Sequence, residues 1–168
     1  IERFFAAAAR LHARSPWQWQ ATAFFTLMHS CGLLTGEARA LLTEQVDLED
    51  GRLDITWSKG NRSRRLPVTS QVVEVLTACQ QTSSRIFPSR RTFFVSATGQ
   101  SVTAAAVGVV FNRIWDRAGL PRPADGSKPR PYDLRHHFAY AGNDSLIWPH
   151  RDGLIWPRVR HTGAVVTV

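Results

Sequence analysis

The chain has 168 residues, of which 43% are hydrophobic and 20% charged, so it is long enough for one domain with a buried core. Lysine and arginine number 21 against 13 acidic residues, which gives a net charge of +8 and an isoelectric point near 10.9. This composition excludes a disordered tail, and no apolar run approaches the roughly 18 residues of a membrane span. The charge predicts a polyanionic partner rather than a small-molecule substrate.

The positive charge is concentrated in the second part of the chain. Residues 1–57 carry five arginines against seven acids, whereas residues 58–168 carry sixteen basic residues against six acids. We therefore expect the polyanion-binding face to be built from the second part. The two cysteines, Cys31 and Cys79, cannot form a disulfide framework, which favours a reducing cytoplasm. Because the chain begins with Ile1 rather than Met, we expect a fragment of a longer protein.

Three helices are predicted before any strand. The first covers Glu2 to Ala13, and the second begins at Pro16 with Ser15 as its N-cap. Thr35 is the candidate N-cap of the third helix, which runs to Leu42.

The spacing of the apolar residues then changes from a helical period to strict alternation. Residues 46–48 and 53–57 alternate around the turn Asp50-Gly51, which predicts a hairpin. Residues 62–68 read as a third, edge strand, because Pro67 cannot donate in a central ladder. The prediction is an α+β fold, mainly α, with a small three-stranded antiparallel sheet.

Two further helices and a changed C-terminal pattern follow. Thr69 or Ser70 caps a helix that ends before a loop at residues 83–88, and Ser101 or Thr103 caps a helix that ends at Gly119. After a proline-rich loop, residues 132–139 resemble the start of another helix. Beyond residue 140 a Leu-Ile-Trp-Pro sequence occurs twice, at 146–149 and 154–157, and its prolines forbid a continuous helix.

The turn before the third strand carries a basic hairpin, residues 59–65. Lys59, Arg62, Arg64 and Arg65 lie there with no acid to neutralise them, and strand periodicity places Arg62 and Arg64 on one face and Arg65 on the other. Such a row of cations suits contacts with nucleic-acid phosphates, but it also suits a solvated edge strand that charge protects from aggregation. Both interpretations stay open.

An ordered series of short motifs resembles the catalytic domain of the tyrosine recombinases, the phage integrase family, most clearly over residues 20–140. The motifs are Gly32-Leu33-Leu34-Thr35-Gly36-Glu37, Val46-Asp47-Leu48, Lys59-Gly60, Phe87-Pro88, Arg117-Ala118-Gly119-Leu120 and Tyr132-Asp133-Leu134-Arg135-His136-His137-Phe138-Ala139. The resemblance implies that a tyrosine attacks a DNA phosphodiester while arginines and a histidine stabilise the phosphate charge and a lysine protonates the leaving oxygen. It implies no metal and no nucleotide cofactor.

The resemblance assigns roles to individual residues. Lys59 matches the hairpin lysine, Arg135 matches the second arginine, and Tyr132 stands where the family has the first histidine of its His-x-x-Arg box. The expected DNA-binding residues are Arg62, Arg64, Arg65, Lys128, Arg130 and His136.

Two departures from the family pattern bear on activity. Leu34 stands where the family has its first arginine, and neither tyrosine, Tyr132 or Tyr140, lies far enough beyond Arg135 to be the nucleophile. We therefore expect an integrase-like catalytic domain over residues 1–140 and an atypical tail over residues 141–168 in place of the nucleophile-bearing segment.

The predicted function is site-specific DNA recombination or integration, impaired in this chain; the alternative is a non-catalytic DNA-binding remnant of an integrase. The expected partner is duplex DNA, with a homo-oligomer on DNA, no membrane, and a nucleoid-associated place in the cytoplasm. Zinc ligation by His29 with Cys31, or by His136 with His137, is not expected, because ligands two apart or adjacent on a helix face different ways and no second pair lies at a suitable spacing.

Overall fold

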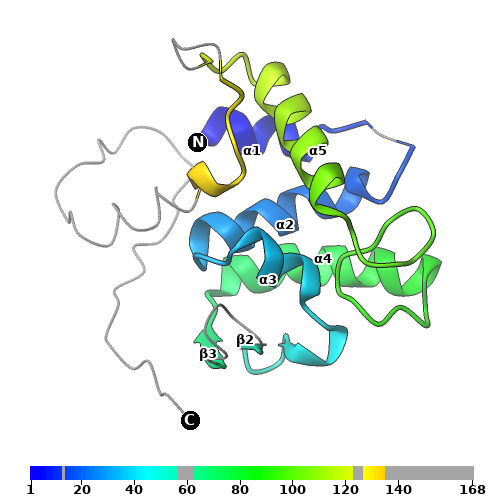
Figure 1. Cartoon of the computed structure of the whole chain (residues 1–168). Helices are drawn as coiled ribbons and strands as arrows, with labels where there is room; N and C mark the ends of the chain where they lie inside the picture. The colour runs from blue at the N-terminus through cyan, green and yellow to red at the C-terminus, as the bar shows by residue number, and fades with distance from the viewer. Residues whose placement is uncertain (13, 57–62, 123–126, 135–168) are drawn as a thin grey trace, which may run out of the picture.

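A computed structural model describes residues 1–12, 14–56, 63–122 and 127–134 (Figure 1). Helices dominate, and one small sheet lies at the end of the molecule opposite to α1 and α5. In chain order the elements are α1 (Glu2–Ala9), α2 (Trp17–Ser30), α3 (Thr35–Ala40), the 3-10 turn η1 (Thr43–Gln45), β1 (Val46–Asp47), β2 (Arg52–Ile55), β3 (Arg64–Pro67), α4 (Ser70–Ile86) and α5 (Ala104–Arg117). The predicted fold class, mainly α with a three-stranded antiparallel sheet, is confirmed.

Helix α2 lies at the centre of the core because it is apolar on nearly all sides. Its Phe24, Phe25, Leu27 and Met28 have no exposed surface. The ring of Phe4 from α1 lies 5.4 Å from that of Phe25, and both lie near the ring of Phe111 from α5, at 5.1 and 5.6 Å. This aromatic triangle holds α1 and α5 against α2.

The sheet has β2 at its centre and β3 at one edge. Leu53 pairs with Val46 of β1 and with Leu66 of β3, so all three strands are antiparallel. Pro67 lies on the edge strand, as its missing N–H predicts. Along β2 the side chains alternate, with Leu53 and Ile55 buried and the residues between them facing solvent.

Several predicted helix starts are confirmed and two are wrong. Thr69 caps α4 and Thr103 caps α5, through backbone N–H groups two residues into each helix. Ser15 and Thr35 are not N-caps: Pro16 and Leu34 occupy those positions, and Thr35 is the first helical residue of α3.

The predicted helix ends are less accurate. The first helix ends at Ala9 and the third at Ala40, short of the predicted Ala13 and Leu42. Helix α4 continues to Ile86, through the predicted loop, because Ser83 is buried and accepts a hydrogen bond from Trp19 Nε1 at 2.9 Å. Ser83, which the sequence analysis places in a loop, therefore forms a polar contact between α4 and α2.

The cysteines lie in or against the apolar core. Cys79 is buried in α4, and Cys31 is half-buried at the C-terminus of α2; both thiols are free. Burial raises the pKa of each thiol to about 12. Among the described helices, none is long and apolar enough to cross a membrane. The predicted tail, residues 141–168, lies outside the described residues.

Candidate functional site

The N-terminus of α3 is the point where the family pattern has its first arginine and this chain has Leu34. Leu34 adopts an extended conformation, with φ −71° and ψ 151°, and is half-buried. Its backbone N–H donates to Glu37 Oε2 at 2.8 Å, so the glutamate three residues later closes the start of the helix. The leucine side chain itself offers no donor for a phosphate.

Arg64 of β3 contacts the start of α3 through a bidentate ion pair with Glu37. Its Nη1 lies 2.7 Å from Glu37 Oε1 and its Nη2 lies 2.8 Å from Glu37 Oε2. The side chain of Glu37 is 5% exposed and that of Arg64 is 26% exposed. Hydrogen bonding to Glu37 raises the pKa of Arg64, against the opposing effect of burial. The pair joins the strand that leaves the basic hairpin to the start of α3.

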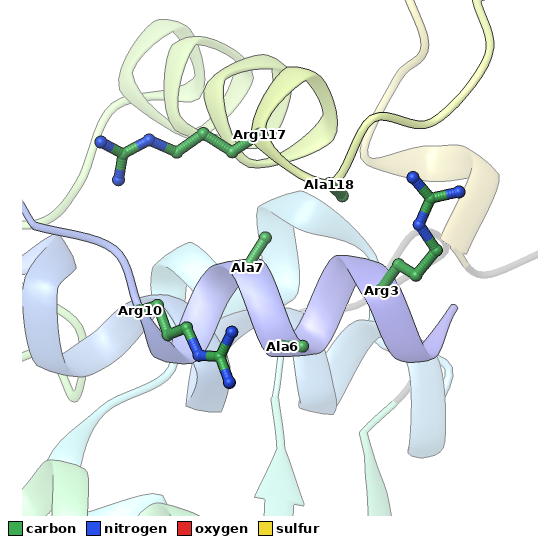
Figure 2. A pocket seen from close by; sticks show the side chains of 6 residues that line it. All are labelled: Arg3, Ala6, Ala7, Arg10, Arg117 and Ala118. Atoms are coloured by element: carbon green, nitrogen blue, oxygen red, sulfur yellow. The ribbon is translucent and has the colours of Figure 1, made fainter.

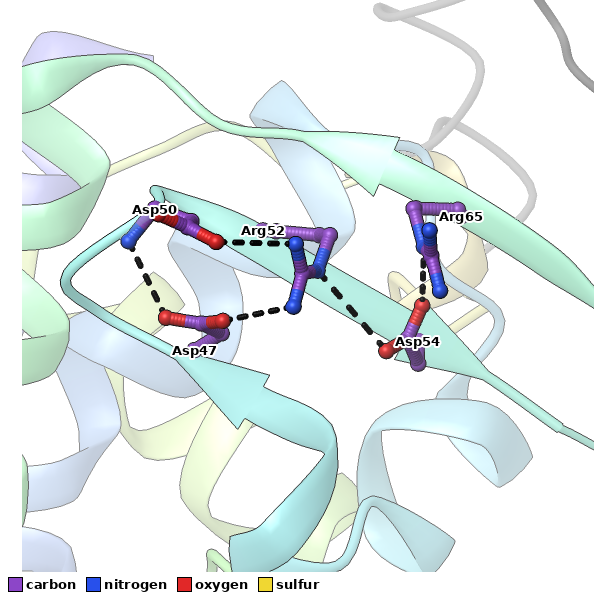
Figure 3. A network of polar contacts seen from close by, with 5 residues as sticks. All are labelled: Asp47, Asp50, Arg52, Asp54 and Arg65. Carbon is purple, nitrogen blue, oxygen red and sulfur yellow. Dashed lines mark hydrogen bonds and ion pairs between the residues drawn. The ribbon is translucent and has the colours of Figure 1, made fainter.

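Arg65, the next residue, faces the other side of the strand and pairs with an acid of β2. Its Nε donates to Asp54 Oδ1 at 2.8 Å, and this hydrogen bond raises the pKa of Arg65. Arg52 lies beside it, with Nη2 2.6 Å from Asp47 Oδ2 and Nη1 2.9 Å from Asp50 Oδ2 (Figure 3). The outer face of the sheet therefore carries a mixed network rather than a row of unpaired cations.

The prediction that no acid neutralises the hairpin cations is wrong for both described arginines. Glu37 and Asp54 are 27 and 11 residues away from their partners in sequence, so a local charge pattern could not reveal them. The opposite facing of Arg64 and Arg65 is confirmed. Their predicted contacts with DNA stay a prediction, since each contact would compete with an existing ion pair.

The start of the His-x-x-Arg box is helical where it is described, over residues 132–134. Arg130 N donates to Asp133 Oδ2 at 2.8 Å, which closes the turn, and Leu134 is 1% exposed in the main core. Tyr132 is 45% exposed. Lys128 and Arg130 also face solvent in the preceding loop.

The remaining predicted site residues lie outside the described residues: Lys59, Arg62, Arg135 and His136. Within the described ranges, the structure brings Leu34, Glu37 and Arg64 together. Glu37 is the residue that sequence reasoning missed as part of the site; the available signal was an acid three residues after the N-cap, in the position of a capping-box glutamate. In the part of the chain that is described, no group of three His, Cys, Asp or Glu residues could hold a metal ion.

Comparisons with known proteins agree with one another. The model of the "Phage integrase family" matches residues 1–144. "Putative integrase/recombinase y4rE" of Sinorhizobium fredii is 34% identical over 115 residues, which cover 67% of this chain and 36% of that protein. "Tyrosine recombinase XerC" of Nitrobacter winogradskyi is 30% identical over 128 residues, covering 75% of this chain and 38% of that protein.

The fold is also similar to solved structures of this family. The XerH site-specific recombinase, solved with its difH substrate in a pre-cleavage complex, superposes with a TM-score of 0.66 at 23% identity, over 82% of this chain and 39% of that one. The chain thus spans between a third and two fifths of the length of the proteins compared. The family match covers most of the chain, and the chain therefore belongs to the phage integrase family, the tyrosine recombinases.

Proposed function

We propose that the chain supplies the catalytic-domain part of a site-specific DNA recombinase, which breaks and rejoins DNA strands. The observation that carries this proposal is the Glu37–Arg64 pair, because it ties the strand after the Lys59 hairpin to the helix start at Leu34. These are two of the places where the family carries catalytic groups. Lys59 would protonate the leaving 5′ oxygen, and Arg135 would stabilise the phosphate charge.

Cleavage is expected to be impaired because Leu34 replaces a guanidinium. An arginine fork aimed at the phosphate stabilises the charge that develops in the transition state, and a leucine cannot. Loss of one such donor costs about 10²–10³ in rate in other enzymes. Tyr132, at the box position of the first histidine, keeps one hydroxyl for a hydrogen bond to a phosphate oxygen.

A non-catalytic DNA-binding role is the second candidate, and Leu34 is the observation that favours it. The excess of basic residues is retained while a phosphate-stabilising arginine is replaced. In both roles the partner is duplex DNA, which would place the protein with the nucleoid. Because lambda integrase, of similar fold, was solved as a dimer bound to a core site and as a tetramer bound to a Holliday junction, we further propose that copies of this chain assemble on DNA.

A library of nicked duplexes with randomised sequence tests the two roles without knowledge of the target site. The full chain and its Leu34→Arg variant are incubated with the library, and protein–DNA adducts that survive detergent are isolated and their sites sequenced. Because an adduct needs a nucleophile, the recombinase role requires Tyr132 or Tyr140 to attack DNA despite its departure from the family position. It then predicts adducts that become about 10²–10³ times more abundant in Leu34→Arg, with a shared sequence around the linked nucleotide.

A control separates chemistry from binding. Adding Arg135→Ala to Leu34→Arg should remove the adducts while duplex binding is kept. Duplex binding without adducts from any variant would contradict the recombinase role and support the DNA-binding one. Absence of duplex binding would contradict both.

A further inference from the structure

Three arginines of the described chain that form no ion pair line one pocket on the side away from the sheet. On the sheet, Arg52, Arg64 and Arg65 all have carboxylate partners. Between α1 and α5 a pocket of about 380 Å³ is lined by Arg3, Ala6, Ala7, Arg10, Arg117 and Ala118 (Figure 2). Within the described ranges, no ion pair reaches any of its three arginines.

The pocket exists because two antiparallel helices meet through small side chains. Ala6 and Ala7 of α1 and Ala118 at the end of α5 line it, and the side chains of Arg3, Arg10 and Arg117 extend from its edges in different directions (Figure 2). Arg3 Nη2 donates to Gly119 O at 3.0 Å at one end, and Arg113 Nη2 donates to His12 O at 3.4 Å at the other. Gly119 has φ +58°, and a Cβ there would lie 2.8 Å from Arg3 Nη2. The glycine therefore leaves the space in which the Arg3 guanidinium lies.

The acidic residues next to the pocket arginines in the sequence do not neutralise them. Asp116 already pairs with Arg122, at 2.6 Å, and Glu2 is exposed at the first turn of α1, where no ion pair of the described chain joins it to a pocket arginine. Arg3, Arg10 and Arg117 are all exposed at the surface. The positive charge of these three guanidinium groups is therefore left without a carboxylate in the described chain, and an anion with several oxygens can accept their paired N–H donors.

We propose that this α1–α5 pocket binds backbone phosphates of duplex DNA, as a contact separate from the basic hairpin. Arg3 and Arg10 are seven residues apart on one helix, which is about 10 Å along its axis. That span exceeds one phosphate group and corresponds to about three nucleotides of one strand, at about 3.4 Å each. The exposed rim and the linear arrangement thus suit a polymer of phosphates better than a single phosphate ion.

This inference rests on the proposed function insofar as the ligand is DNA. It goes further by giving the chain two DNA-contacting surfaces, since α1 and α5 lie at the end of the molecule away from the sheet (Figure 1). A contact there would add to affinity without reading sequence, because phosphates carry no base information.

The test removes two charges from the pocket and compares the result with the same loss elsewhere. Arg10→Gln with Arg117→Gln is the pocket variant, because neither side chain forms an ion pair within the described residues, whereas Arg3 holds Gly119 O. Arg85→Gln with Arg91→Gln is the matched control, since both are exposed arginines with no ion pair in the described chain. Affinity of the full chain for a random duplex is measured by fluorescence anisotropy at several salt concentrations.

The pocket variant should lose about 1.8 from the slope of log affinity against log salt, which corresponds to about 0.9 for each lost phosphate contact. This is roughly a 10- to 100-fold weaker complex at 0.1 M salt, whereas the control keeps the slope of the unmodified chain. The Arg10→Lys with Arg117→Lys variant should bind nearly as the unmodified chain does, because it keeps both charges.

Three results would overturn the inference. The first is a pocket variant that matches the Arg85/Arg91 control while the unmodified chain still binds DNA, which leaves the proposed function intact. The second is calorimetric binding of inorganic phosphate or pyrophosphate that depends on Arg10 while DNA affinity does not, which would make the ligand a small anion. The third is no duplex binding by the unmodified chain, which would end the proposed function as well.

Discussion

Replacing Arg64 with glutamine tests whether the ion pair with Glu37 fixes the candidate site. The substitution removes both hydrogen bonds that the guanidinium makes to the carboxylate, at 2.7 and 2.8 Å. The Glu37 side chain is only 5% exposed, so water cannot fully replace the lost partner. A charge that stays buried after its partner is removed destabilises the folded state.

The expected cost follows from burial. Hydrogen bonds to charged groups contribute about 1.5–3 kcal/mol each, and breaking a fully buried ion pair costs about 3–5 kcal/mol. Arg64 is 26% exposed, so part of the site can be rehydrated. We therefore expect Arg64→Gln to lower the free energy of unfolding by about 2–3 kcal/mol.

Urea denaturation of the full chain, followed by far-UV circular dichroism, measures this change. Arg65→Gln is the control, because it removes the same group from the next residue of the same strand, where the ion pair with Asp54 is exposed. A Glu37→Gln/Arg64→Gln double variant should be less destabilised than the sum of the two single variants. The reasoning is refuted if Arg64→Gln costs no more than Arg65→Gln, or if the two single effects simply add.

Three further predictions concern stability and reactivity. The backbone N–H of Asp50 holds the pKa of Asp47 below its usual value, so Asp47→Asn should destabilise at pH 7. The difference from the unmodified chain should begin to shrink as the pH falls below about 4, the usual pKa of an unfolded aspartate, and should be lost as the pH falls through the lower folded pKa; a difference that stays constant from pH 7 down to pH 2 would count against this. In a Cys31→Ser variant the remaining buried thiol, Cys79, should react with a thiol reagent at pH 8 only after unfolding, and fast labelling of the folded chain would contradict its raised pKa of about 12. Phe111→Ala should lower the free energy of unfolding by about 3–5 kcal/mol with an unchanged urea m-value, and a loss below 1 kcal/mol would show that the aromatic triangle is not the core.

Features that depend on near neighbours were predictable from the sequence. The threonine caps of α4 and α5, the Asp50-Gly51 turn and the edge position of Pro67 each follow from groups a few residues apart. Gly51 has φ +60°, the conformation that the turn requires. The helix ends were less predictable, because Ser83 stays helical through its contact with Trp19, 64 residues away.

In the candidate site, too, features set by neighbouring residues were predictable and features set by distant contacts were not. The replacement of an arginine by Leu34 is visible in the sequence, because the motif around it is short and ordered. The role of Glu37 is not visible in the sequence, because its partner Arg64 lies on a strand 27 residues later. The assignment of Arg64 to DNA contact rested on its local surroundings, which contain no acid, whereas the folded chain supplies one.

The sequence by itself determined the family, the mainly helical fold with its small sheet, the net charge of +8 and the departure at Leu34. Only the tertiary structure decided which of the described positive charges are available to a ligand. A net charge is a sum over residues and contains no pairing, whereas each ion pair depends on which elements the fold places together. Arg64 and Arg65 of the sheet are consequently neutralised by acids from α3 and β2, and the pocket between α1 and α5 keeps its charge.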